Sequence, residues 1–195
     1  MYRVAILGSG RGSNAEALLR AQEEGRLGPA QVLAIYSDQP HARILELGPR
    51  YEVTSAYLDP GPYRTKFSEE AEAHWANAID SVAPDLVVLA GFMRVLKEPL
   101  LKAFAGRIIN LHPSLLPKYP GLHAIKQAYD AGDAETGCTV HWVSEVVDAG
   151  KIIAQAKVPR HDDDTLEALE ERVHQAEHAL LSKVVRKLAE DAIFG

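Results

Sequence analysis

The chain has 195 residues, of which 47% are hydrophobic and 25% charged, which is typical of a globular protein with a sizeable core and excludes disordered and fibrous classes. This length predicts one domain over residues 1–195. A net charge of −6 argues against a nucleic-acid partner, and the apolar runs are too short to span a bilayer. The absence of a signal-peptide pattern predicts a cytoplasmic protein. A single cysteine, Cys138, predicts no disulfide within the chain and no cysteine-based metal site.

Apolar segments rich in β-branched residues alternate with amphipathic segments, a pattern that predicts an α/β fold. We expect a Rossmann-like, mostly parallel sheet with helices on both faces, because several strand candidates are apolar throughout. The expected strands are residues 3–7, 31–36, 52–57, 86–89 and 107–111. The expected helices are residues 14–24, 65–82 and 124–131, each ended by a glycine or a proline.

The alternation changes in the last third of the chain. Residues 138–143 and 151–158 read as strands, and the connection between them is too short for a crossover helix. They should therefore form an antiparallel pair. A final helix is expected from about Thr165, with one apolar stripe facing the core and with Asp164 and Glu167 as a capping box.

A glycine-rich segment, residues 8–14, joins the first expected strand to the first helix. Glycines let a ligand approach the backbone closely, and amides at a helix start attract anions, so we interpret the segment as a phosphate loop. It lacks the lysine of a Walker loop, and Ser13 replaces the third glycine of the dinucleotide fingerprint. A nicotinamide site remains an alternative because Asp38 follows the second strand. The other alternative is a plain turn capped by Ser13 or Asn14.

Asn110 and His112 end a strand expected at the centre of the sheet. They are two residues apart, so their side chains share a face at the edge where open α/β sheets bind ligands. Pro113 favours an extended His112. An amide beside an imidazole suits acyl transfer, because one group can stabilise an oxyanion while the other moves a proton. A histidine that only packs against prolines is the structural alternative.

Two further polar residues lie on or after the first of the paired strands. Asp148 falls in the connection at 144–150, where it could orient a histidine or simply cap a turn. His141 shares a strand face with Thr139 and Val143. Its role stays open, because a lone histidine there is more often a hydrogen-bonded core residue.

The last helix carries His174, Glu177 and His178 in the H-x-x-E-H pattern of some zinc peptidases. The two histidines would share a helix face, but a zinc site needs a third ligand that the pattern does not supply. Because Glu177 also suits a helix flank that faces a cleft, we expect no metal site.

Four segments in one order resemble the folate-dependent formyltransferase family, and within it the phosphoribosylglycinamide formyltransferases of purine synthesis. The length and the phosphate loop favour these over the related enzymes that act on methionyl-tRNA or release formate. The segments are residues 9–14 (SGRGSN), 88–96 (VLAGFMRVL), 110–121 (NLHPSLLPKYPG) and 137–150, which ends in Asp148-Ala149-Gly150.

The resemblance implies transfer of the formyl group of 10-formyltetrahydrofolate, a co-substrate, to the amine of glycinamide ribonucleotide, without a metal. Asn110, His112 and Asp148 match the family's catalytic residues, with Asn110 also facing the folate. An NAD(P)-dependent oxidoreductase is the alternative function. The family pattern assigns the substrate to Gly12, Ser13, Asn14 and Glu177, and the folate to Arg64 (or Lys66), Met93, Arg94, Val95, Leu96, Ser144, Glu145, Val146 and Val147.

Under the same resemblance the chain divides into a phosphate-binding half, residues 1–100, and a folate-binding and catalytic half, residues 101–195. The expected partners are these two small molecules. The chain would be a monomer or a homodimer.

Overall fold

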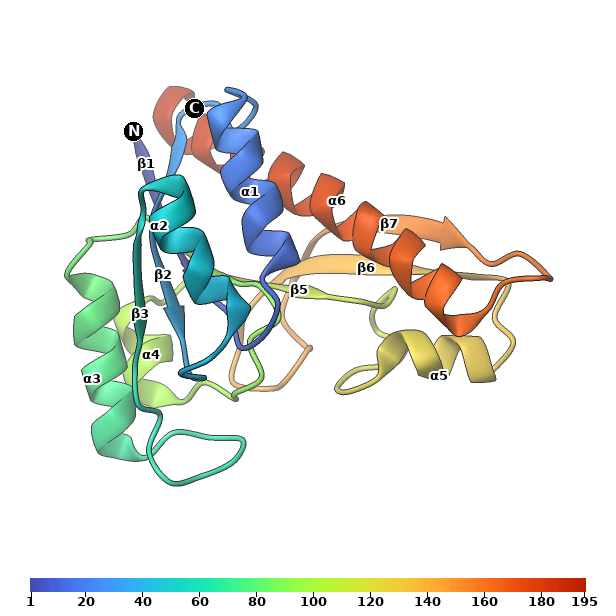
Figure 1. Cartoon of the computed structure of the whole chain (residues 1–195), viewed down its shortest axis with the longest axis horizontal. Coiled ribbons are helices and arrows are strands. Elements are labelled where there is room, and N and C mark those ends of the chain that lie inside the picture. The colour runs from blue at the N-terminus through green and yellow to red at the C-terminus, as the bar shows by residue number, and fades with distance from the viewer.

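The apolar segments of the first half form neighbouring parallel strands in the computed structural model, which describes residues 1–195 (Figure 1). Each strand lies within two residues of its expected bounds. Helices cover both faces of this part of the sheet, as buried parallel strands require. The strands are β1 (Tyr2–Leu7), β2 (Ala30–Ser37), β3 (Thr54–Tyr57), β4 (Leu86–Leu89) and β5 (Ile108–His112).

The expected antiparallel pair is confirmed. Strands β6 (Glu135–Trp142) and β7 (Ile152–Pro159) pair with each other, and β6 also pairs antiparallel with β5, which joins them to the main sheet. The seven strands lie in the order β3-β2-β1-β4-β5-β6-β7.

Alternating side chains of the central strands divide the core in two. Val4 and Ile6 pack with one set of helices, whereas Ala5 and Leu7 pack with the set on the opposite face. The first layer contains α1 (Ser13–Glu23) and α6 (Leu166–Phe194), and the second contains α3 (Glu69–Asp80) and α4 (Glu98–Ala103). The short helices η1 (Arg43–Glu46), α2 (Leu47–Tyr51) and α5 (Ala124–Asp130) complete the fold.

Helix α3 differs from the expectation in its start, and α6 differs only in its cap. Helix α3 begins at Glu69 instead of residue 65, because the Ser68 hydroxyl caps it by accepting from the Ala71 amide. At α6 the predicted capping box is wrong. The Thr165 hydroxyl caps that helix, while the Asp164 carboxylate accepts from Arg172 and from the His161 amide, contacts that draw it away from the helix start.

The order of the strands reverses between β1 and β4. From β1 the chain first builds outward to β2 and β3, and then crosses back to β4 on the other side. In open α/β sheets ligands bind where the order reverses, at the carboxyl ends of the strands. The phosphate loop leaves β1 at this point, and residues 90–96 leave β4 beside it. None of the helices has the length and apolarity to cross a membrane.

Candidate active site

The phosphate loop enters α1 without a side-chain cap. Gly12 stands at the N-cap in a left-handed conformation, with φ of 81°. A Cβ at this position would lie 2.8 Å from the Ile44 Cβ atom, so both backbone and packing require glycine. The alternative interpretation of this segment, a plain turn capped by Ser13 or Asn14, is wrong, because no side chain caps the helix. The first amides of the helix are therefore free of a side-chain acceptor, as an anion-binding loop requires.

Glu177 lies beside this loop although it belongs to α6. Its side chain is buried, and Oε2 accepts from Asn14 Nδ2 at 3.3 Å and contacts His174 Nδ1 at 2.8 Å. Burial and the nearby charge of Glu177 raise the pKa of the Cys138 thiol to about 12. Asn14 Oδ1 is buried without a partner, which leaves an acceptor for a ligand hydroxyl or amine.

The H-x-x-E-H residues do not assemble a ligand set. His174 is bonded to Glu177, and no three His, Cys, Asp or Glu side chains are grouped to hold a metal ion. The hydrogen bond to Glu177 raises the pKa of His174 against the opposing effect of burial. Glu177 therefore belongs to the environment of the phosphate loop.

The raised pKa of His174 gives a stability prediction. A raised pKa in the folded state stabilises the fold below the unfolded value of about 6.5, and this contribution disappears as pH rises through the folded pKa. The difference in free energy of unfolding between the wild type and His174→Gln should therefore be largest at about pH 5.5, with the wild type more stable, and should shrink above about pH 6.5. Urea unfolding across this range measures it. A difference that grows with pH would contradict the assignment.

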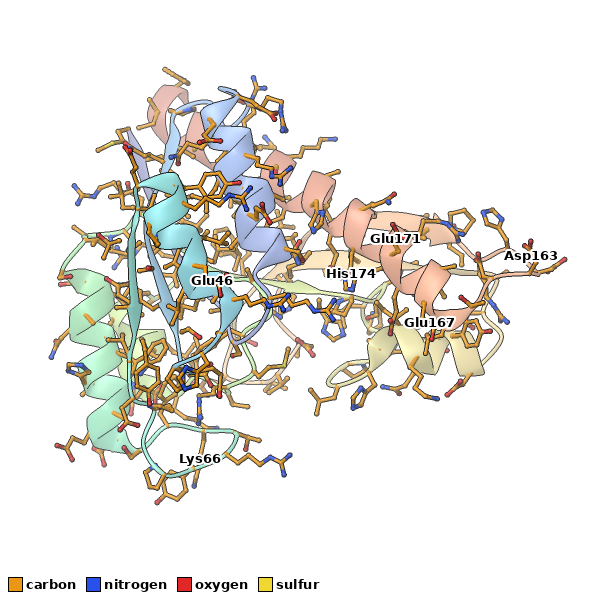
Figure 2. All side chains as sticks on the ribbon, viewed as in Figure 1. Glu46, Lys66, Asp163, Glu167, Glu171 and His174 are labelled. Carbon is orange, nitrogen blue, oxygen red and sulfur yellow. The ribbon has the colours of Figure 1, made fainter.

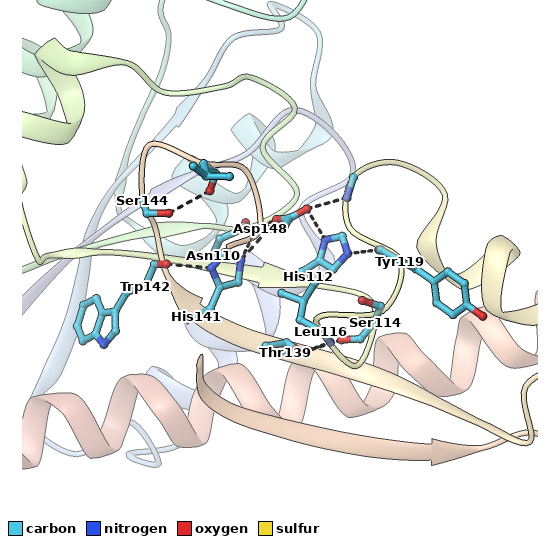
Figure 3. Close-up of polar contacts among 12 residues, drawn as sticks. Asn110, His112, Ser114, Leu116, Tyr119, Thr139, His141, Trp142, Ser144 and Asp148 are labelled. Carbon is cyan, nitrogen blue, oxygen red and sulfur yellow. Dashed lines mark hydrogen bonds and ion pairs between the residues drawn. The ribbon is translucent and has the colours of Figure 1, made fainter. Parts of the chain in front are cut away.

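The carboxyl end of β5 brings Asn110 and His112 to one face, as their spacing predicts. His112 is buried at 5% exposure, and its Nε2 lies 2.8 Å from the carbonyl oxygen of Tyr119 (Figure 3). Because that carbonyl is an acceptor, Nε2 carries the proton in this arrangement.

Asp148 reaches the same face from the connection between β6 and β7. It adopts a left-handed conformation, with φ of 53°, that turns its carboxylate back toward the strand. Oδ2 accepts from the Gly121 amide at 2.8 Å and lies 3.4 Å from His112 Nδ1, and Oδ1 lies 3.4 Å from Asn110 Nδ2. The sequence predicted these three residues from two segments far apart in the chain, and the structure brings them together.

The pKa of Asp148 is lowered. Burial alone would raise it, but hydrogen bonds from His141 and the Gly121 amide, with the charge of His112, outweigh that effect. The carboxylate is therefore ionised at neutral pH and can stabilise a positive charge on an imidazole beside it.

His141 also belongs to this cluster, although the sequence left its role open. Its ring is buried, with Nδ1 2.9 Å from the Trp142 carbonyl oxygen and Nε2 3.2 Å from Asn110 Nδ2 and 3.5 Å from Asp148 Oδ1. The antiparallel register sets His141 directly opposite Asn110. A sequence argument that paired β5 with β6 in antiparallel register would have predicted the contact between His141 and Asn110.

The Thr139 side chain fixes the loop after His112 through hydrogen bonds to its backbone. Its hydroxyl donates to the Ser114 carbonyl at 2.7 Å and accepts from the Leu116 amide at 3.1 Å, and Gln155 Nε2 donates to both Leu116 O and Thr139 Oγ1. These contacts fix residues 114–116 of the loop. The Tyr119 carbonyl, which lies 2.8 Å from His112 Nε2, comes three residues later.

The segment expected to hold the folate heterocycle is tied to the phosphate loop. The Met93 amide donates to Ser9 Oγ at 2.9 Å, and the Ser9 amide donates to the Gly91 carbonyl at 3.1 Å. Met93 is 59% exposed, and Val146 and Val147 in the other expected folate segment are also exposed. Apolar side chains in these positions are available to a ligand. Leu96, however, is buried in the core, so its side chain faces away from solvent.

The ion pair between Arg94 and Asp38 bears on two expectations, the contact of the Arg94 side chain with a folate and the nicotinamide alternative. The Arg94 guanidinium is buried and pairs with Asp38 at 2.7 Å, and it also donates to the carbonyls of Tyr63 and Lys66 at 2.6 and 2.8 Å. Its side chain thus anchors the loop at residues 63 and 66, and only its backbone remains for a folate. Asp38 is buried in the same ion pair, which removes the free ribose-binding carboxylate of the nicotinamide alternative. Arg64 lies exposed on the anchored loop.

Known proteins resemble this chain over most of its length. A sequence profile described as formyl transferase matches residues 2–185. A phosphoribosylglycinamide formyltransferase of Bacillus subtilis is 39% identical over 96% of this chain and 95% of its own length. A trifunctional purine biosynthetic protein adenosine-3 of Drosophila melanogaster is 44% identical over 90% of this chain, which spans only 13% of that larger protein.

Solved structures agree in fold as well as in sequence. A glycinamide ribonucleotide transformylase of Symbiobacterium toebii superposes with a TM-score of 0.91 at 42% identity, covering 98% of this chain and 89% of its own. A phosphoribosylglycinamide formyltransferase of Bacillus halodurans gives 0.90 at 43% identity, covering 97% of this chain and 96% of its own.

Proposed function

This chain belongs to the formyl transferase family, and on that premise we propose that it transfers the formyl group of 10-formyltetrahydrofolate to the primary amine of glycinamide ribonucleotide. The products are formylglycinamide ribonucleotide and tetrahydrofolate. The reduced folate is a co-substrate, and the reaction uses no metal.

One observation carries this proposal. The phosphate loop after β1, the exposed Met93 segment after β4, the end of β5 with Asn110 and His112, and Asp148 after β6 all lie at the same edge of the sheet. A substrate with a phosphate at one end and an amine at the other suits this arrangement, because the phosphate is held away from the reacting atoms.

The trio of Asn110, His112 and Asp148 supplies the chemistry of acyl transfer. As the neutral amine forms its bond to the formyl carbon, His112 donates a hydrogen bond to the developing oxyanion, and Asn110 Nδ2 gives up its long contact with Asp148 Oδ1 to donate a second one. Asp148, ionised at neutral pH, stabilises the imidazolium form of His112. The bond between the formyl carbon and the folate nitrogen then breaks, and Asp148 and His112 help a proton move from the attacking amine to that nitrogen.

His112 Nε2 already donates to the Tyr119 carbonyl. An oxyanion that accepts from the same nitrogen must replace this carbonyl, so catalysis requires residues 117–121 to shift when the substrates bind. His141 holds the Asn110 amide in place through its contact with Nδ2, which makes it a positioning residue for the oxyanion donor.

The remaining site residues divide between the two substrates. The amides near Gly12, Ser13 and Asn14 and the Ser13 hydroxyl bind the phosphate, and Glu177 faces the glycinamide portion of the substrate. Backbone groups of residues 93–96 and 144–147 bind the folate heterocycle, with Arg64 near its benzoyl group.

A spectrophotometric assay tests the proposal. Formation of tetrahydrofolate should depend on glycinamide ribonucleotide, should require no NAD(P)H, and should persist after exhaustive chelation. Binding of NAD(P)H without turnover of the folate would contradict formyl transfer, and loss of activity on chelation would contradict the metal-free reaction.

A further inference from the structure

A charged cavity of about 400 Å³ lies against the phosphate loop, on the side of η1 and α2. In Figure 2, Glu46 marks the η1 side and His174 marks α6. The polar residues that line the cavity are Arg11, Ser13, Glu16, Arg43, Glu46 and Arg50. Ser13 belongs to both the cavity and the phosphate loop, so the two are continuous.

The charges in the cavity are not balanced. Glu16 is already paired, with Arg20 at 2.8 Å and with Arg50 at 3.0 Å. Arg11 and Arg43 make no ion pair with any carboxylate of the chain. With Glu46 as the only other carboxylate in the lining, the cavity keeps an excess of positive charge and two exposed guanidinium groups.

The backbone holds both arginines beside the loop. Arg11 is part of it, and Arg43 precedes Ile44, whose amide donates to the Gly10 carbonyl at 3.1 Å. The close packing of Gly12 against Ile44 fixes the same approach. Arg11 also lies close enough to α6 for its charge to lower the pKa of His174, against the raising effect of Glu177.

We propose that Arg11 and Arg43 bind the phosphate of the substrate from the cavity side, and that they determine the preference of the enzyme for a phosphorylated amine. This inference rests on the proposed function. Guanidinium groups form charge-assisted, often bidentate hydrogen bonds with phosphate oxygens. The backbone loop would then orient the phosphate while the arginines supply most of the charge.

The test compares Arg11→Gln/Arg43→Gln with a control that removes two charges elsewhere, Arg26→Gln/Arg186→Gln, at exposed positions. On glycinamide ribonucleotide the first variant should lose about 100-fold in kcat/KM, since each arginine contributes about tenfold or more through a charge-assisted hydrogen bond. On the dephosphorylated riboside its kcat/KM should match the wild type. The control should match the wild type on both substrates.

Three results would overturn the proposal: a loss below tenfold on the phosphorylated substrate, equal losses on both substrates, or the same selective loss in the control. Thermal unfolding with inorganic phosphate as the probe separates this inference from the proposed function. Phosphate should raise the thermal midpoint of the wild type and of the control, but not that of Arg11→Gln/Arg43→Gln. Equal protection of all three would refute the arginine site even if the wild type transferred no formyl group.

Discussion

Replacing His112 by alanine is expected to lower turnover by roughly 10²- to 10⁴-fold while the fold stays intact. The ring supplies a hydrogen bond to the oxyanion and takes part in moving the proton. Asp148→Asn should have a similar effect, because it preserves shape but removes the charge that stabilises the imidazolium. Asn110→Ala should follow, since it removes the second oxyanion donor. Steady-state kinetics at saturating folate and substrate measure these losses.

His161→Ala provides the matched control, because this histidine is exposed in the turn before α6 and lies outside the trio. Its turnover should equal that of the wild type. Circular dichroism and thermal midpoints check that each variant is folded. If all three trio variants were folded and kept near-normal turnover, the catalytic assignment would be wrong.

Gly12→Val should reduce kcat/KM for the phosphorylated substrate by about 100-fold or more, because a small misplacement of bound substrate is enough for a loss of that size. Valine disfavours the φ of 81° at this position, and its Cβ would meet Ile44 at 2.8 Å, so the loop must move. Phosphate binding is remote from the amine, but it positions the amine against the formyl carbon. Both rate and affinity should therefore fall.

Two variants calibrate this result. Gly106→Val introduces valine at another left-handed glycine, with φ of 68° and open space around it, and should lower stability without changing substrate preference. Ser13→Ala should lose less than Gly12→Val, since it removes one charge-assisted hydrogen bond of about 1.5 to 3 kcal/mol. Equal losses for Gly12→Val on the phosphorylated and dephosphorylated substrates would show that the loop does not bind phosphate.

The sequence was most informative where function depends on the carboxyl ends of strands. Gly12 and His112 could be placed at the site because strands β1 and β5 are mostly apolar, and buried parallel strands of this kind end together at one edge of the sheet. The antiparallel pair was also predictable, since residues 144–150 leave no room for a crossover helix.

Long-range pairing was not predictable in the same way. The contact between Arg94 and Asp38 joins residues 56 positions apart, and nothing in either local pattern indicates it. The guanidinium donates hydrogen bonds to the carbonyl oxygens of residues 63 and 66. These contacts hold residues 63–66 in a loop, so the helix expected from residue 65 starts later. The role of His141 stayed open for a related reason, because it depends on which residue of β5 lies opposite.

Transfer of an isotopically labelled formyl carbon tests the central claim most directly. With labelled 10-formyltetrahydrofolate and glycinamide ribonucleotide, the wild type should place the label on the substrate amine in a one-to-one ratio with the tetrahydrofolate formed. His112→Ala should do so far more slowly. Release of the label as free formate, or tetrahydrofolate formation that does not depend on the amine, would contradict formyl transfer to this substrate.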